Sequence, residues 1–167
     1  MIPKRAFLLL FSVCFLFSGN LEAGQENIFR DITDSLTVTL PPGAKQDYPE
    51  RLDPVGKHGD SYTYTLPGVK DALILLSTFY ASLDGEGAFW VLLDELEAEE
   101  NGLTTAAIQG RSIPVGFYTT PGGKILVTAL FAEDGLLMAV LIPEQEFAGA
   151  RRWIRDLIYS VRFIQKE

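Results

Sequence analysis

The sequence has little of the residues on which most catalytic and metal sites depend, since it contains one cysteine and one histidine. The cysteine, Cys14, falls within an apolar leader, so we expect the mature chain to form no disulfide, thiolate metal site or cysteine nucleophile. The histidine, His58, stands near Asp53 and Asp60, but zinc normally takes three or four protein ligands and no others are spaced to help. We therefore interpret His58 as a solvated loop residue and predict no metal and no cofactor. A metal or acid–base role is the alternative.

Motifs for common catalytic mechanisms are also absent. The sequence has no Gly-x-Ser-x-Gly segment for a nucleophilic serine. Gly122-Gly123 lies within a predicted hairpin rather than before a helix, where a phosphate-binding loop would be. Residues 84–87, Asp-Gly-Glu-Gly, do not follow the ligand pattern of a calcium loop and are interpreted as a turn. These absences favour a protein that is not an enzyme.

Residues 1–23 have the three parts of a secretory signal peptide. Two basic residues precede an apolar run at residues 6–17, and Ala23 supplies a small residue before Gly24. The run is shorter than the roughly 20 residues that a membrane-spanning helix needs. We predict cleavage between Ala23 and Gly24, which makes the rest of the chain, residues 24–167, a single domain that is periplasmic or secreted.

The charge balance limits the classes of partner that the protein can bind. The chain has 14 basic and 22 acidic residues and a formal net charge of −8. A protein this acidic repels polyanions, so we expect no nucleic-acid partner and no attraction to anionic membrane surfaces. Membrane contact would come only through an uncleaved signal peptide or, as a lesser alternative, a lipidated Cys14.

The clearest folding signal is a predicted antiparallel meander in the second half of the chain. Residues 112–117 alternate apolar and small or polar side chains, as a strand with one buried face does. Residues 125–132 and 136–142 are apolar runs. The breaks are Pro121-Gly122-Gly123 and Glu133-Asp134-Gly135, and Asp-Gly between apolar runs is a strong hairpin signal.

The first half predicts further strands and two irregular segments. Residues 36–40 and 61–66 alternate like strands and end at Pro-Gly breakers. Residues 71–81 are apolar for much of their length, for which we favour a strand paired with 61–66, with a helix as the alternative. We expect residues 44–60 to be a long surface loop and residues 24–34 to be a short helix or a loose arm.

Two helices are predicted. Residues 88–100 have an apolar stripe at helical spacing and end at Asn101-Gly102, which resembles a C-cap. The acidic run 94–100 is interpreted as the solvent face of this helix, with a docking surface for a basic partner as the alternative. The second helix begins near Pro143 and carries acidic residues early and arginines late, as the helix dipole favours. A last strand is expected at 160–164.

The predicted fold class is α+β: mainly antiparallel sheet, formed by a meander plus a hairpin, with two helices packed against it. Leu-Thr-Val-Thr-Leu-Pro-Pro-Gly at residues 36–43 resembles the opening of the PsbP-like superfamily, whose members include the extrinsic photosystem protein and small exported bacterial proteins. Ile108-Gln109-Gly110 is similar to that family's mid-chain strand and glycine. The ending at 147–163, with Ser160-Val161-Arg162-Phe163, is similar to its closing helix and strand.

The resemblance implies a PsbP-like α/β/α sandwich that serves as a binding or assembly module without catalysis. We therefore predict an exported, non-catalytic module that contacts a protein partner or a small apolar ligand. The candidate contacts are His58, Asp60, Trp90, Arg151 and Arg152, although pairing with helical acids is the more ordinary use of the arginines. The alternative is an exported hydrolase with a carboxylate and histidine site in the 44–60 loop.

Overall fold

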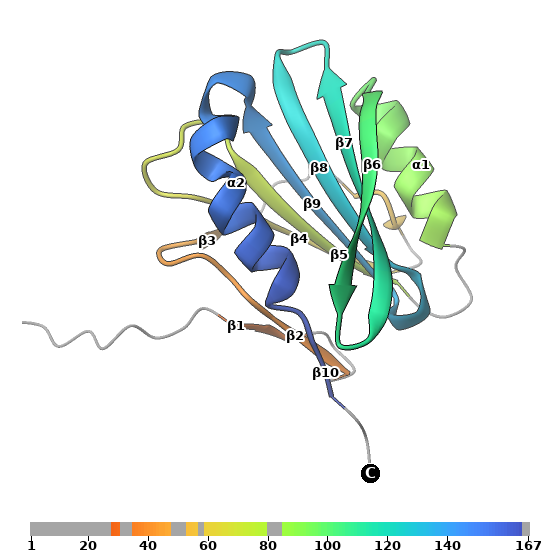
Figure 1. Ribbon diagram of the computed structural model, residues 1–167. Helices are drawn as coiled ribbons and strands as arrows, with labels where there is room; N and C mark the ends of the chain where they lie inside the picture. Colours follow the sequence, from red (N-terminus) through yellow and green to blue (C-terminus); the bar gives the residue numbers. More distant parts are fainter. Residues whose placement is uncertain (1–27, 31–34, 48–52, 57–58, 80–84, 165–167) are drawn as a thin grey trace, which may run out of the picture.

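The computed structural model describes residues 28–30, 35–47, 53–56, 59–79 and 85–164. In this part of the chain, strands form two antiparallel sheets (Figure 1). The larger sheet has the order β3-β4-β5-β9-β8-β7-β6 and the smaller one the order β1-β2-β10. The strands are β1 (Ile28–Arg30), β2 (Leu36–Thr39), β3 (Lys45–Asp47), β4 (Gly59–Thr65), β5 (Leu73–Phe79), β6 (Glu99–Ile108), β7 (Arg111–Thr120), β8 (Lys124–Phe131), β9 (Leu136–Pro143) and β10 (Arg162–Phe163).

Strand β9 is the centre of the larger sheet, and all eight of its residues are buried. Met138, Val140 and Ile142 belong to one apolar cluster, which includes the buried side chains of helix α2 (Glu144–Tyr159). Leu137 and Leu141 belong to a second cluster with helix α1 (Gly85–Glu95). Because side chains alternate across a strand, the two helices cover opposite faces of the sheet (Figure 1). The predicted α+β class with two helices packed against a mainly antiparallel sheet is confirmed.

The meander and the closing helix follow the prediction. β7, β8 and β9 pair in sequence, and β5 is a strand that pairs with β4 on one side and β9 on the other. The helical alternative for residues 71–81 is therefore wrong. In α2, Pro143 occupies the N-cap position rather than the first turn, and Ala150, Ile154, Leu157 and Ile158 are buried.

The predicted first helix was too long. α1 ends at Glu95, and Glu99 and Glu100 lie in β6 instead of on a helical solvent face. The Ala98 amide donates to the Leu93 carbonyl at 2.9 Å and the Glu97 amide to the Asp94 carbonyl at 3.1 Å, which is the bond pair of a Schellman ending. The chain then enters β6 because nine of the ten residues of that strand pair with β7, and Asn101 lies at the irregularity in that pairing instead of at a C-cap.

Two other expectations were wrong within the described ranges. The segment predicted as a short helix or loose arm contains strand β1, which pairs with β2. The expected 44–60 loop contains β3, paired with β4, and Val55, which is buried under the α1 side of the sheet. The strand expected at 160–164 is present as the shorter β10, which pairs with β2 in the smaller sheet beside α2. Residues 1–27 lie outside the described ranges. The signal peptide, its cleavage between Ala23 and Gly24, and the place of Cys14 within it therefore remain predictions.

The end of α1 gives a first testable expectation. Glu97 has a φ of 48°, a left-handed conformation that favours glycine, and its side chain is exposed. We expect Glu97→Gly to raise the free energy of unfolding by about 0.5–1 kcal/mol, measured by urea denaturation. Glu95→Gly, two residues earlier inside the helix, is the matched control and should lower it by up to about 1 kcal/mol. Equal effects of the two changes would contradict the Schellman assignment.

Tyr118 gives a second expectation, which concerns pH. Burial raises the pKa of Tyr118 above its ordinary value of 10.0, the charge of Glu100 adds to the rise, and a hydrogen bond with Thr128 opposes it. The unfolded chain therefore ionises first, so stability present below pH 10.0 is lost as the pH rises through the folded pKa.

Tyr118→Phe removes the hydrogen bond with Thr128, so its free energy of unfolding near neutral pH should be about 1 kcal/mol lower than that of the native chain. Above pH 10, its free energy of unfolding should fall less than that of the native chain. Urea denaturation between neutral pH and pH 11 measures both effects, and Tyr159→Phe, which changes an exposed tyrosine, is the control. An unchanged alkaline loss in Tyr118→Phe would rule out the ionisation of Tyr118 as its cause.

Candidate ligand-binding groove

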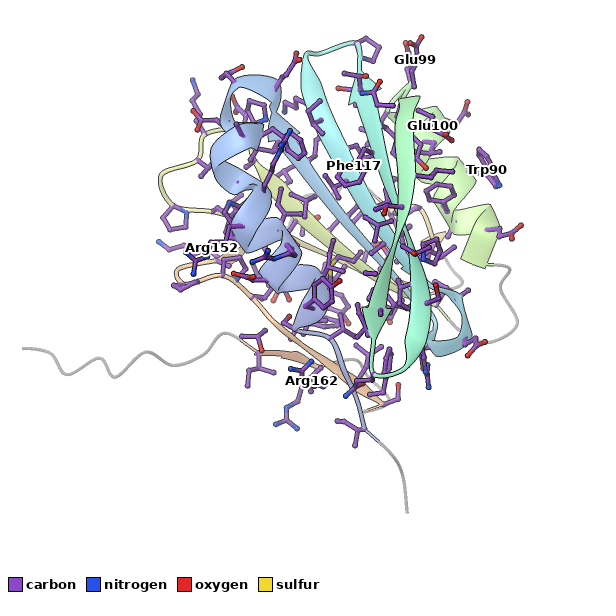
Figure 2. All side chains as sticks on the ribbon, in the orientation of Figure 1. Trp90, Glu99, Glu100, Phe117, Arg152 and Arg162 are labelled. Carbon is purple, nitrogen blue, oxygen red and sulfur yellow. The ribbon has the colours of Figure 1, made fainter. Side chains whose placement is uncertain are left out.

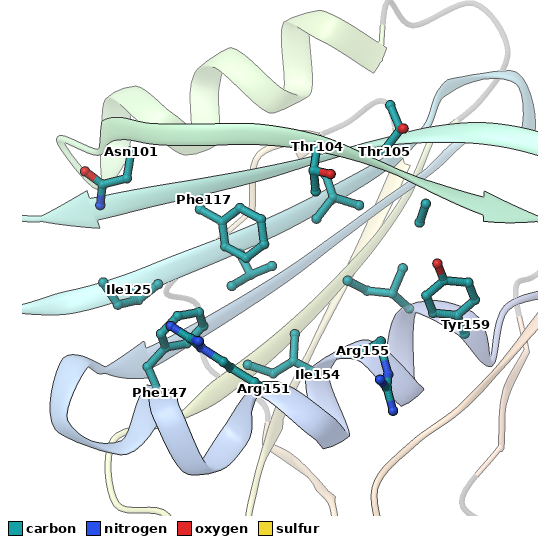
Figure 3. A pocket seen from close by; sticks show the side chains of 14 residues that line it. Asn101, Thr104, Thr105, Phe117, Ile125, Phe147, Arg151, Ile154, Arg155 and Tyr159 are labelled. Atoms are coloured by element: carbon teal, nitrogen blue, oxygen red, sulfur yellow. The ribbon is translucent and has the colours of Figure 1, made fainter.

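A groove of about 560 Å³ lies between α2 and the part of the sheet formed by β6, β7 and β8 (Figure 3). We call it the α2 groove. Its floor consists of Val115 and Phe117 from β7 and of Ile125 and Val127 from β8. These residues share one face because Phe117 stands opposite Val127, and positions two apart along a strand point the same way. Alternation in the meander thus makes the floor apolar.

The helical wall of the groove combines apolar and cationic side chains. Phe147 and Ile154 face the floor, and the rings of Phe147 and Phe117 meet edge to face with centroids 6.4 Å apart. Arg151 and Arg155, one helical turn apart, line the same wall. Figure 3 shows the Arg151 side chain next to Phe147, and the guanidinium carbon lies 5.1 Å from the centre of that ring. This distance is within the range of a cation–π contact, which holds the cation at the groove.

The two arginines predicted as contacts, Arg151 and Arg152, have different surroundings in the structure. Arg152 points away from the sheet (Figure 2), and its side chain lies 3.9 Å from Asp156. Arg155 lies 3.4 Å from the same carboxylate while also lining the groove. Among the residues that the structure describes, no carboxylate forms an ion pair with Arg151. Helical pairing therefore occupies Arg152, and Arg151 is the cation left to meet a ligand.

The opposite wall is polar and comes from β6. Asn101 and Thr104 line it. The Asn101 side-chain amide donates to the Thr119 hydroxyl at 2.6 Å, which fixes it where the β6–β7 pairing is irregular. The groove is therefore amphipathic: an apolar floor, arginines on one rim, and amide and hydroxyl groups on the other.

Ser160 fixes the helix that forms the wall. Its hydroxyl donates to the Leu157 carbonyl at 2.7 Å and approaches the Thr39 carbonyl at 3.1 Å, while the Thr39 amide donates to it at 3.0 Å. The end of α2 is thereby joined to β2. The following strand is held too, since the Phe163 amide donates to the side chain of Gln109 at 3.1 Å. Ser160 and Phe163 belong to the segment on which the PsbP-like resemblance rested.

The other predicted contacts lie elsewhere. Trp90 is 62% exposed on α1, on the opposite side of the sheet (Figure 2). Asp60 is in β4, opposite Thr78, and His58 lies outside the described residues. The carboxylate of Asp53 accepts hydrogen bonds from the Gly56 amide at 3.0 Å and the Ser61 hydroxyl at 2.9 Å, so it braces a turn.

Two properties of the described residues limit the chemistry. They contain no group of three or more His, Cys, Asp or Glu side chains that could hold a metal ion. The helices among them are not long and apolar enough to cross a membrane. Sequence reasoning named Arg151 but missed Phe117, Phe147 and Thr104 as groove residues. The alternation of Phe117 and the stripe position of Phe147 were visible, but they indicate burial and not a cavity.

The role of Ser160 is testable. Ser160→Ala removes the link between α2 and β2, and we expect a loss of roughly 1–2 kcal/mol in the free energy of unfolding, measured by urea denaturation. Ser112→Ala, at an exposed site on β7, is the control and should change stability by less than about 0.5 kcal/mol. A loss no larger than the control's would show that Ser160 does not hold the helix.

Comparison with known proteins rests on structure. No protein-family model matches the sequence, and no curated protein sequence matches it. The chain is similar to the solution structure of cyanobacterial PsbP (CyanoP) from Synechocystis sp. PCC 6803, with a TM-score of 0.60 and 11% sequence identity. The match covers 87% of this chain and 96% of that one. The structure therefore confirms the PsbP-like fold predicted from the sequence, and at this identity the similarity concerns the fold alone.

Proposed function

We propose that the protein is an exported, non-catalytic binding module that holds a small amphipathic anion in the α2 groove. The observation that carries the proposal is the combination, in one groove, of an apolar floor with the Arg151 guanidinium, which has no carboxylate partner among the described residues. Export rests on the signal-peptide pattern of residues 1–23.

The apolar part of the ligand would occupy the floor. A volume of about 560 Å³ lies within the range of roughly 300–1,000 Å³ that is usual for small-molecule sites. Transfer of each methylene group of the ligand from water onto the floor around the partly exposed Phe117 would contribute up to about 0.8 kcal/mol. A linear alkyl chain suits a groove that runs beside a helix, because it can lie along the strands and the helix at once.

The anionic end of the ligand would meet the arginine rim. A guanidinium binds a carboxylate through two parallel hydrogen bonds, and Arg151 is already positioned by Phe147. Arg155 lies one turn along α2 and forms an ion pair with Asp156 at the exposed surface, where such pairs are weak. It can therefore leave Asp156 and make the second contact with the ligand. A fatty-acid-like carboxylate therefore meets both parts of the groove.

The lining supports binding rather than catalysis. It includes hydroxyl, amide and guanidinium groups but no carboxylate, histidine, cysteine or serine. A hydroxyl nucleophile there would lack an adjacent base. The alternative hydrolase site in the 44–60 segment would need Asp53, which the structure engages in a turn, together with His58 and Asp60.

Dodecanoate tests the proposal, with dodecanol and dodecyltrimethylammonium as uncharged and cationic comparisons in isothermal titration calorimetry. We expect dodecanoate to bind most tightly, and Arg151→Gln to weaken it about tenfold while leaving dodecanol unchanged, which corresponds to about 1.4 kcal/mol. Arg152→Gln, on the outer face of the same helix, is the matched control and should have no such effect.

A second variant tests the location. Thr104→Trp, at the exposed β6 rim, should fill the groove and block both dodecanoate and dodecanol. If dodecanoate bound equally well to this variant, or if dodecyltrimethylammonium bound as tightly as dodecanoate, the proposed site would be wrong.

A further inference from the structure

Strand β6 forms one edge of the larger sheet. β6 spans ten residues and, in the part of the chain that the structure describes, pairs only with β7. The strand at the opposite edge, β3, has three residues. Edge strands are commonly kept short or protected by lysine or proline, because their unpaired backbone groups can accept another strand. β6 contains no lysine, arginine or proline.

The register identifies which backbone groups of β6 are open. β6 and β7 are joined by Gln109 and Gly110, with φ of 48° and 80°, and such a two-residue turn is closed by a hydrogen-bonded pair, here Ile108 with Arg111. Pairing then alternates along the strands, so Thr105 opposite Pro114 is a pair without mutual bonds. The proline fits there because it has no amide to donate. The amides and carbonyls of Leu103, Thr105 and Ala107 therefore point outward.

Apolar side chains lie beside this open edge, on the α1 side of the sheet. Leu103 is 64% exposed and stands opposite Gly116, and the ring of Tyr118 lies over Gly116 in the space where a side chain would be. The Tyr118 ring contacts Phe89 at 6.0 Å between centroids, and Phe89 contacts Trp90, which is itself 62% exposed. Leu103 is thus linked to Trp90 through the buried Tyr118 and the half-buried Phe89, and we call these four residues the edge strip.

Charge is concentrated at one end of the same edge. No lysine or arginine occurs between Lys70 and Arg111 in the sequence. Glu97, Glu99 and Glu100 are exposed near the start of β6, and the ion pairs found among the described residues do not include them. Figure 2 shows Glu99 and Glu100 at this end of the strand, on the same side of the molecule as Trp90.

We propose that β6 is a docking edge for an extended segment of a partner protein, added antiparallel to β6. The open backbone groups require an extended chain, the edge strip requires apolar side chains opposite Leu103, and the acidic end requires lysine or arginine beside Glu99 and Glu100. Because the added strand runs opposite to β6, its basic residues lie at its C-terminal end. This surface shares β6 with the α2 groove, whose lining includes Thr105, but it lies at the free edge of the strand and does not depend on a ligand in the groove.

The probe is a short blocked peptide of alternating valine and threonine that ends in two lysines, and its control has the same residues with the lysines at the N-terminal end. Amide hydrogen exchange measured by NMR should show at least fivefold slower exchange at Leu103, Thr105 and Ala107 with the first peptide. Thr104 and Ala106, already bonded to β7, should change little. The control peptide should protect these amides less.

Variants locate the contact. Leu103→Lys, at an exposed site that leaves the core intact, should weaken peptide binding about tenfold. Thr105→Pro removes one outward amide and should weaken peptide binding as well. Ile28→Lys, at an exposed apolar site on β1, is the matched control and should have no effect. Arg151→Gln should not alter peptide binding, which separates this test from that of the groove.

Three results would overturn the proposal. The first is the absence of protection at the three outward amides, and the second is equal protection by both peptides. The third is concentration-dependent protection of these amides in the protein alone, together with a dimer in analytical ultracentrifugation, because the occupant of the edge would then be a second copy of the chain.

Discussion

The structure depends on the burial of β9 on both faces. Its eight residues, from Leu136 to Pro143, lie in the middle of the larger sheet and are all buried. A strand that is apolar on both sides needs cover on both sides, whereas most antiparallel sheets can leave one face to water. The position of α2 directly after β9 supplies cover on one face, and α1, inserted between β5 and β6, supplies it on the other. The α/β/α arrangement follows from this one strand.

One helix on each face does not cover seven strands completely. α2 packs mainly over β8 and β9, and the smaller sheet adds Phe29, Leu36 and Val38 to the same core. On the side of β6 the helix no longer lies directly on the sheet, and the α2 groove lies there, with Phe117 as the partly exposed residue of a floor that is otherwise buried. The other face is similarly incomplete, since α1 leaves Leu103 exposed beyond the ring of Tyr118. Both proposed surfaces therefore lie where the cover ends, beside the last strand of the sheet.

Local signals predicted the meander, the β4–β5 hairpin and α2, because alternation, Pro-Gly breaks and helical stripes act over few residues. They failed where tertiary pairing decided. Glu99 and Glu100 continue a helical pattern, yet they join β6 because the β7 partner is available across a two-residue turn. β3 and β1 were missed because three-residue strands have almost no periodicity. The groove was beyond sequence reasoning, since no local pattern shows that Arg151, Phe117 and Thr104 meet from three separate elements.

Charge decides which chain can use the open edge. A second copy of the chain carries the same net charge of −8, so two copies repel each other at long range even in an antiparallel pairing that keeps Glu99 of one away from Glu99 of the other. Acidic residues at an edge thus act against self-association, as charged residues on edge strands commonly do. The same residues attract a segment that carries lysine or arginine. Charge thus disfavours pairing of the edge with further copies of the protein and favours a basic partner, which lowers the aggregation hazard of a long unpaired strand.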